Sequence, residues 1–181
     1  MIKRCLVATV VAVMLTVGRV GAITVVPMTF EQLVAESDAV IYARVGQVRG
    51  QWTPDRRSID SIVTLDVLRY LRGDLGESVL LRLPGGEAGG RVNVVPGAPI
   101  LREGELVVVF LDSQAPAIPT VLGLTQGLFR VRPDAQTGMP MVTPPPLKAS
   151  EAGRIVRGAA QRRTLTIEAF AATVRDLENV R

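Results

Sequence analysis

Histidine is absent from this chain of 181 residues, and cysteine occurs once, at Cys5. Without an imidazole, Ser-His and Cys-His nucleophiles cannot be built, and zinc sites that depend on histidine are excluded. Disulfides within one chain are equally impossible. The basic residues other than Lys3 and Lys148 are arginines, which keep their proton at working pH. General acid–base chemistry would therefore depend on carboxylates or tyrosines.

Aromatic residues are also scarce. They make up 4% of the sequence, with a single tryptophan, Trp52. Hydrophobic residues as a whole reach 48%. A chain of about 150 residues buries close to 70% of its unfolded surface. One globular domain can thus be stable without disulfides.

The N-terminus has the three parts of a secretory signal peptide. Lys3 and Arg4 precede an uncharged, mostly apolar run over residues 5–18, and a run of small residues ends at Ala22. The apolar run is shorter than the roughly 20 residues that a membrane-spanning helix needs. We therefore expect cleavage near Ala22, a processed chain that begins at Ile23 without cysteine, no permanent membrane anchor, and a secreted or periplasmic location.

The positive charge of the chain belongs partly to this signal peptide. The whole chain carries 21 Lys and Arg against 17 Asp and Glu, a net charge of +4. Removal of residues 1–22 takes away Lys3, Arg4 and Arg19 and no acid, which leaves 18 basic against 17 acidic residues. Nucleic-acid binders need a clear basic excess on one face. The composition therefore predicts no nucleic-acid partner.

A short helix is predicted from Phe30 to about Glu36. Thr29 and Gln32 stand at the spacing of a capping box, in which the two side chains satisfy backbone N–H groups at the start of a helix. The apolar residues of this segment recur at helical spacing and would form one face, made of Phe30, Leu33 and Val34.

Segments rich in β-branched residues, separated by turn signals, follow from residue 39. Residues 105–111 (ELVVVFL) are almost entirely apolar, which predicts a strand buried on both faces. Because no helical pattern separates successive strands, we expect an antiparallel sheet or barrel. The expected strands are 39–48, 58–70, 79–83, 91–95 and 105–111, with a final hairpin formed by 121–124 and 127–132.

Residues 133–163 differ in composition from the strands. They contain five prolines and a local excess of basic residues, which predicts an extended Pro/Arg-rich arm that becomes partly helical from about Ala149. Residues 164–181 then have the pattern of an amphipathic helix that Thr166 can cap. Its apolar stripe, which must pack against another part of the protein, consists of Ile167, Phe170, Ala171, Val174 and Leu177.

Two loops contain the candidate binding residues. Trp52 lies in a polar turn segment with Arg56 and Arg57, and Arg91 follows a glycine-rich passage over residues 84–90. A tryptophan beside guanidinium groups can serve as an anchor for a partner, although a lone tryptophan also commonly packs on the end of a core. The glycine-rich passage lacks the lysine and the following helix of a phosphate-binding loop, so we interpret it as a hairpin tip.

The carboxylates offer weaker candidates. A glycosidase needs two acids at a fixed separation, and an EF-hand calcium loop needs acids that alternate over a dozen residues. The sequence contains no such loop, and surface carboxylates are ordinary. We therefore predict no catalytic residue, no metal and no cofactor. The acids considered are Asp55, Asp60, Asp66, Asp74 and Glu87.

In their order, five short segments resemble those of uncharacterised secreted bacterial proteins. The same order of a helix, several strands and a barrel-like closure is similar to the OB-like barrel of netrin-type domains and of tissue inhibitors of metalloproteinases. The matching segments, within about residues 30–132, are 33–40 (LVAESDAV), 67–74 (VLRYLRGD), 83–86 (LPGG), 104–111 (GELVVVFL) and 127–131 (GLFRV).

This resemblance implies a mainly β fold. It consists of an antiparallel, OB-like closed barrel of five to seven strands within residues 23–132, with a short N-terminal helix and a C-terminal helix. No functional residue carries over. The metalloproteinase inhibitors bind the enzyme's zinc through an N-terminal cysteine, whereas the processed chain would begin at Ile23.

The first functional hypothesis is a secreted, non-enzymatic binding or protein-interaction module. Its partner would be a protein or glycan of the cell envelope or the medium, bound by the loops 51–57 and 85–91 at one end of the barrel. A protease inhibitor that acts through an exposed loop or its N-terminal segment is the alternative. A carboxylate-based hydrolase of envelope polymers is the third and weakest hypothesis.

Overall fold

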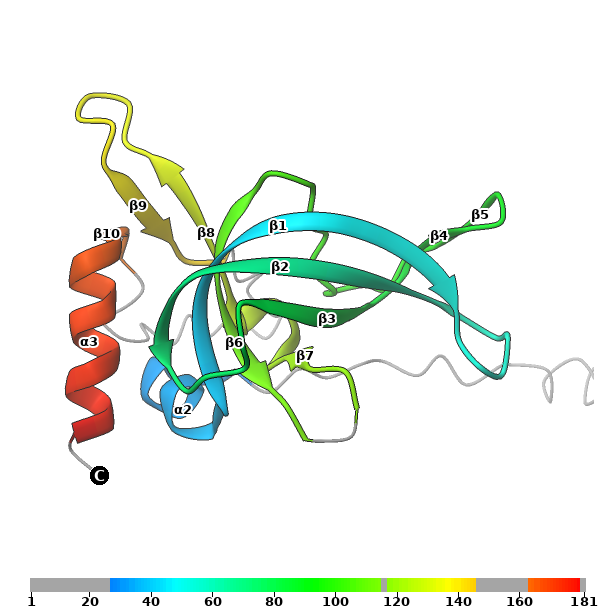
Figure 1. The fold of residues 1–181 in the computed structure, drawn as a ribbon, viewed down its shortest axis with the longest axis horizontal. Helices are drawn as coiled ribbons and strands as arrows, with labels where there is room; N and C mark the ends of the chain where they lie inside the picture. Colours follow the sequence, from blue (N-terminus) through cyan, green and yellow to red (C-terminus); the bar gives the residue numbers. More distant parts are fainter. Residues whose placement is uncertain (1–26, 115–116, 146–162, 180–181) are drawn as a thin grey trace, which may run out of the picture.

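The computed structural model describes residues 27–114, 117–145 and 163–179. The predicted signal peptide, its cleavage site near Ala22, and residues 146–162 of the predicted arm lie outside these ranges. Within them the chain is mainly β, and a helix lies near each end (Figure 1).

A long antiparallel hairpin forms the largest part of the sheet. Strands β1 (Ala39–Trp52) and β2 (Ile59–Arg72) pair along almost their whole length, up to Trp52 opposite Ile59. The register shifts between Val45 and Val48, where one strand has an extra residue. Such a bulge bends a strand and increases its twist. The two strands have 14 residues each, and the far end of the hairpin extends past the rest of the sheet (Figure 1).

Five strands of the sheet are hydrogen-bonded in a ring. Its order is β1-β2-β3-β7-β6, and β6 pairs with β1 to complete it. All neighbours in the ring are antiparallel except β3 and β7, which are parallel and share a single register pair, Arg82 opposite Thr120. The strands added here are β3 (Ser78–Pro84), β6 (Leu106–Asp112) and β7 (Thr120–Val121).

Beyond the ring, the sheet continues from β6 through three more strands. They are β8 (Leu128–Pro133), β9 (Pro140–Thr143) and β10 (Leu165–Thr166). This differs from the extended arm expected from residue 133. Pro133 and Pro140 lie opposite each other at the loop end of the β8–β9 hairpin. Proline is tolerated at a strand end because no ladder N–H is needed there.

One hydrophobic cluster fills the inside of the ring. On β6, alternate residues point inward and pack against inward residues of β1, β2 and β3. Val107, Val109 and Leu111 are completely inaccessible to solvent. The buried residues of this cluster are all aliphatic.

A second cluster lies on the outer face of the same strands, beneath the two helices. Val108 and Phe110, the other residues of β6, contribute to it, so β6 is buried on both faces as its apolar sequence predicts. All four phenylalanines of the chain meet here, with ring centroids as close as 5.2 Å between Phe129 and Phe170. Most of these pairs are edge-to-face, the arrangement that aromatic quadrupoles favour.

The helices form where their capping patterns predict. Helix α2 (Phe30–Glu36) begins with a complete capping box between Thr29 and Gln32. In α3 (Ile167–Asn179), the Thr166 hydroxyl accepts a hydrogen bond from Ala169 N–H. No described helix has the length and apolarity needed to span a membrane.

Helix α3 is held to the end of β2 by ion pairs. Arg69 binds Glu168 at 2.8 Å, and Arg72 lies 3.5 Å from Glu178. The Arg72 guanidinium also donates a hydrogen bond to the Val34 carbonyl, so one side chain joins α2, α3 and the sheet. The helices occupy the side of the molecule opposite the free end of the β1–β2 hairpin (Figure 1).

Removal of one ring from the phenylalanine cluster should be costly. Phe170 is 1% exposed and contacts three other rings, so we expect Phe170→Ala to lower the free energy of unfolding by about 3–5 kcal/mol. Urea unfolding followed by circular dichroism measures this loss. Phe170→Leu, which keeps most of the volume, should cost less than about 1.5 kcal/mol. Equal losses in the two variants would contradict the packing described.

Candidate functional site

The turn between β1 and β2 carries two of the predicted site residues. Arg56 and Arg57 are exposed at its tip, and Arg56 adopts a left-handed backbone with φ of 55°. Hydrogen bonds within the turn stabilise it. One carboxylate oxygen of Asp55 accepts a hydrogen bond from the Thr53 hydroxyl at 2.6 Å and another from the Arg57 N–H at 3.2 Å. The Thr53 hydroxyl and the Arg57 N–H lower the pKa of Asp55 below its ordinary value.

Trp52 and Arg91 are brought together by the fold, although 39 positions separate them in the sequence. The Arg91 guanidinium lies 6.0 Å from the centroid of the indole ring, within the range of a cation–π contact. Trp52 is half-buried and belongs to neither of the two hydrophobic clusters. Trp52 therefore packs at the free end of the β1–β2 hairpin, outside both clusters. Arg56 and Arg57 follow it along the chain at the exposed turn.

The hairpin of β4 (Gly86–Ala88) and β5 (Arg91–Asn93) brings Arg91 to this position. It folds back over the end of β1, and the backbone of Glu87 passes directly over Gly50. No residue with a Cβ fits at Gly50 without movement of one of the two chains. The Asn93 side-chain amide anchors β5 to the start of β2 by donating a hydrogen bond to the Ser58 hydroxyl at 2.7 Å.

A concave surface, which we call the hairpin groove, lies beside this hairpin. Its cavity volume is about 360 Å³, and it is mostly apolar. Three of its side chains are unusually open to solvent for aliphatic residues: Val92 is 68% exposed, Val94 76% and Ile100 71%. The other lining residues include Val48, Gly50, Ser61, Leu83, Pro84, Gly85, Gly86, Glu87, Asn93, Val95, Ala98, Pro99 and Leu101.

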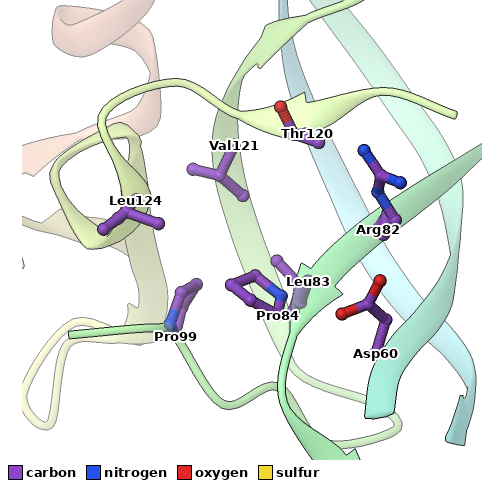
Figure 2. Close-up of a pocket in the computed structure, with 8 residues that line it drawn as sticks. All are labelled: Asp60, Arg82, Leu83, Pro84, Pro99, Thr120, Val121 and Leu124. Atoms are coloured by element: carbon purple, nitrogen blue, oxygen red, sulfur yellow. The ribbon is translucent and has the colours of Figure 1, made fainter. Parts of the chain in front are cut away.

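A second cavity, the seam pocket, lies where the ring closes between β3 and β7 (Figure 2). Strand β7 has only two residues. It pairs with β3 at one position, Thr120 opposite Arg82. The open space beside that pair has a volume of about 350 Å³. Its lining residues are Asp60, Arg82, Leu83, Pro84, Pro99, Thr120, Val121 and Leu124.

Leu124 forms one wall of the seam pocket in a strained backbone conformation. It begins the 3-10 turn η1 (Leu124–Gly127) with φ of 58°, directly after Gly123 at 63°. A leucine in this region costs on the order of 1–3 kcal/mol, and such strain persists only where the surroundings enforce it. Here the Leu122 N–H binds the Phe110 carbonyl at 2.9 Å, and the buried Gln126 side chain accepts from Met28 N–H at 2.8 Å.

Each of the two cavities has one carboxylate in its lining, Asp60 in the seam pocket and Glu87 in the hairpin groove. Neither therefore offers the facing pair of acids that glycoside hydrolysis uses. Over residues 27–114, 117–145 and 163–179, no group of three or more Asp, Glu, His or Cys side chains is arranged to hold a metal ion.

Trp52 and Arg91 could be predicted as site residues from the sequence, whereas the residues around them could not. Val92 and Val94 belong to a segment expected to be an edge strand, and their exposure depends on where the β4–β5 hairpin folds. Asp60 was considered only as a surface acid, and Arg82 was not singled out at all. A charged residue in an otherwise apolar strand, as in VLLRL, was the available signal for Arg82.

No protein-family model matches the chain, and no match to a curated protein was found.

The close approach at Gly50 gives a direct test of how the β4–β5 hairpin is held. Gly50→Ala should cost about 1–3 kcal/mol or displace the hairpin, because the new methyl group meets the Glu87 backbone. Urea unfolding and Trp52 fluorescence report the two effects. Gly46→Ala, on the same strand, places its Cβ 3.3 Å from both an Asp66 carboxylate oxygen and the Thr64 carbonyl oxygen, far looser than the contact at Gly50, and should cost less than about 1 kcal/mol. Equal behaviour of the two variants would refute this contact.

Thr53→Val should raise the pKa of Asp55 toward its ordinary value, because the largest contribution to the lowered pKa is the Thr53 hydroxyl. In the unchanged protein, the Asp55 carboxylate stabilises the fold above its unfolded pKa. That contribution disappears as the pH falls through the lower folded pKa. An NMR titration of side-chain carboxyl carbons measures both variants. The lowered pKa of Asp134, which is caused by bonds from Thr137, should not change and serves as the internal control.

Proposed function

We propose that this protein is a non-enzymatic interaction module that binds an extended segment of a partner protein along the hairpin groove. The observation that carries the proposal is the exposure of Val92, Val94 and Ile100 together on one concave surface. Single exposed aliphatic residues are ordinary, but a group of them around a groove is typical of an interaction site. The Trp52–Arg91 contact lies at the same end.

The backbone of β5 supports an extended ligand. In the described part of the chain β5 forms a strand ladder only with β4. Strand β2 approaches its Asn93 end through a side-chain hydrogen bond to the Ile59 carbonyl but does not pair with it, so the other edge of β5 carries no ladder. A peptide strand can add to such an edge through main-chain hydrogen bonds, while alternate side chains provide the specificity. Val92 lies in β5, and Val94 follows directly after the strand ends at Asn93; both side chains are exposed at the groove.

Three arginines near the groove, against the single carboxylate of Glu87 in its lining, favour a ligand with acidic residues. Arg56, Arg57 and Arg91 are exposed, and none of them takes part in the three ion pairs of the described residues. Guanidinium groups bind carboxylates in two-point contacts that set orientation. A peptide with alternating apolar residues and flanking Asp or Glu would satisfy both the groove and the arginines.

A protein segment is favoured over a glycan by the chemistry of this surface. Sugar binding relies on an open aromatic face, whereas the Arg91 guanidinium lies over the Trp52 ring. The most exposed side chains at the groove are aliphatic instead.

We further propose that the five-stranded ring is an OB-like barrel. Its single parallel pair, between the third strand and the short β7, and its closure by β1 and β6 support this assignment. In OB-folds the loop between the first two strands commonly takes part in binding, which by analogy agrees with a site beside the β1–β2 turn. The single carboxylate in each cavity favours binding over hydrolysis.

A peptide-display selection on the purified protein tests this function. We expect enriched peptides in which apolar residues alternate and acidic residues flank them. A double variant, Val92→Ser with Val94→Ser, should bind these peptides at least about tenfold more weakly, which corresponds to about 1.4 kcal/mol. Fluorescence polarisation measures the affinities. Trp52→Ala should also weaken binding, while its melting temperature changes by less than about 4 °C.

The matched control replaces exposed leucines elsewhere on the sheet. Leu68 and Leu80 are 49% and 48% exposed on β2 and β3, away from the groove lining. Leu68→Ser with Leu80→Ser should leave peptide affinity unchanged. The proposal fails when no peptide is enriched, or when the Val92/Val94 variant binds as well as the control. Glycan-array binding that survives in the Val92/Val94 variant would indicate a sugar ligand instead.

A further inference from the structure

The rim of the seam pocket carries two opposite charges that do not neutralise each other. Asp60 lies opposite Pro84 in the β2–β3 register and Arg82 lies opposite Ile62, so the two charged residues are diagonal neighbours on adjacent strands. Diagonal residues are about 7–8 Å apart, close enough for one small ligand to reach both. Neither side chain has a hydrogen-bond or ion-pair partner in the described part of the chain.

The opposite wall of the seam pocket is apolar. Figure 2 shows Asp60 and Arg82 on one side of the opening and Pro99, Val121 and Leu124 on the other. Pro99 and Val121 are buried and therefore fixed in place. The volume of about 350 Å³ equals the space of roughly a dozen water molecules. This is enough for a small organic molecule but not for a folded segment of protein.

These features together define the ligand. A ligand with only a carboxylate would bring a second negative charge to Asp60, and one with only an ammonium group would face Arg82. A molecule that carries both groups side by side, together with an aliphatic side chain, satisfies the rim and the apolar wall at once. We propose that the seam pocket binds a free aliphatic α-amino acid as its zwitterion, with Arg82 on the carboxylate and Asp60 on the ammonium group.

The pocket is built before any ligand arrives. Across the ring closure, the Arg82 N–H donates a hydrogen bond to the carbonyl of Pro119, the residue before its register partner Thr120, at 2.8 Å. The Leu124 wall is held by the enforced turn after Gly123. Ligand binding therefore needs little reordering of the backbone, which favours affinity. The seam pocket shares Leu83, Pro84 and Pro99 with the hairpin groove, but its charged rim is separate.

An NMR titration of the purified protein with L-leucine tests the proposal. We expect saturable shifts of the backbone amides of Arg82, Thr120 and Val121, with a Kd on the order of 1 mM for so small a ligand. Leucinamide, which lacks the carboxylate, and 4-methylpentanoate, which lacks the ammonium group, should each bind at least about tenfold more weakly. Glycine, which lacks the aliphatic side chain, should also bind more weakly than leucine.

Two variants of the charged rim residues, with two control variants elsewhere on the sheet, test which charges bind the ligand. Asp60→Asn and Arg82→Gln should each weaken leucine binding at least about tenfold. Asp66 and Arg44 are exposed, face each other on β1 and β2, and line neither cavity, so Asp66→Asn and Arg44→Gln should bind leucine normally. Melting temperatures of the four variants should agree with that of the unchanged protein, which confirms that each is folded.

Three outcomes would overturn the proposal. They are the absence of saturable shifts at the pocket amides, normal leucine binding by both Asp60→Asn and Arg82→Gln, and binding of either single-charge analogue as tight as that of leucine. The double variant of Val92 and Val94 should still bind leucine, so failure here and failure of the peptide-binding function can be told apart.

Discussion

The rest of the structure depends on the pairing of β1 with β6. Residues 39–44 of β1 are bonded to 106–111 of β6 on one edge and to β2 on the other, which closes the ring. Because both strands alternate between the two hydrophobic clusters, the same backbone ladder supports the aliphatic interior and the phenylalanine cluster under the helices. Loss of this ladder would expose both clusters together.

The closure divides the molecule into a densely packed side and the side that carries the proposed binding site. Near β6 and the helices, aromatic packing and the Arg72 contacts to α2 and α3 tie the elements together. At the other end, the β1–β2 hairpin continues beyond the ring, where, among the described elements, the β4–β5 hairpin covers it (Figure 1). Short hairpins on a rigid sheet are suitable carriers of binding residues, because changes there leave the core intact.

The sequence predicted the parts of this fold that depend on local patterns. The capping residues located α2 and α3, and the apolar run identified β6, since caps and burial on both faces leave marks within a few residues. The ring closure through Arg82 and Thr120 could not be predicted, because one parallel pair leaves no periodic signal. For the same reason the seam pocket was missed, whereas Trp52 stood out by its rarity and its arginine neighbours. The meeting of Trp52 with Arg91 depends on the close approach at Gly50, which a sequence pattern does not reveal.

The most direct test of the central claim is hydrogen–deuterium exchange of the protein with and without a selected peptide. A peptide that adds to the β5 edge must protect backbone amides of residues 91–95 and of the segment around Ile100, together with the turn after Trp52. Exchange in β6 and the helices should stay unchanged. Protection confined to the helix side, or no protection along β5, would contradict the account of this hairpin end as the interaction surface.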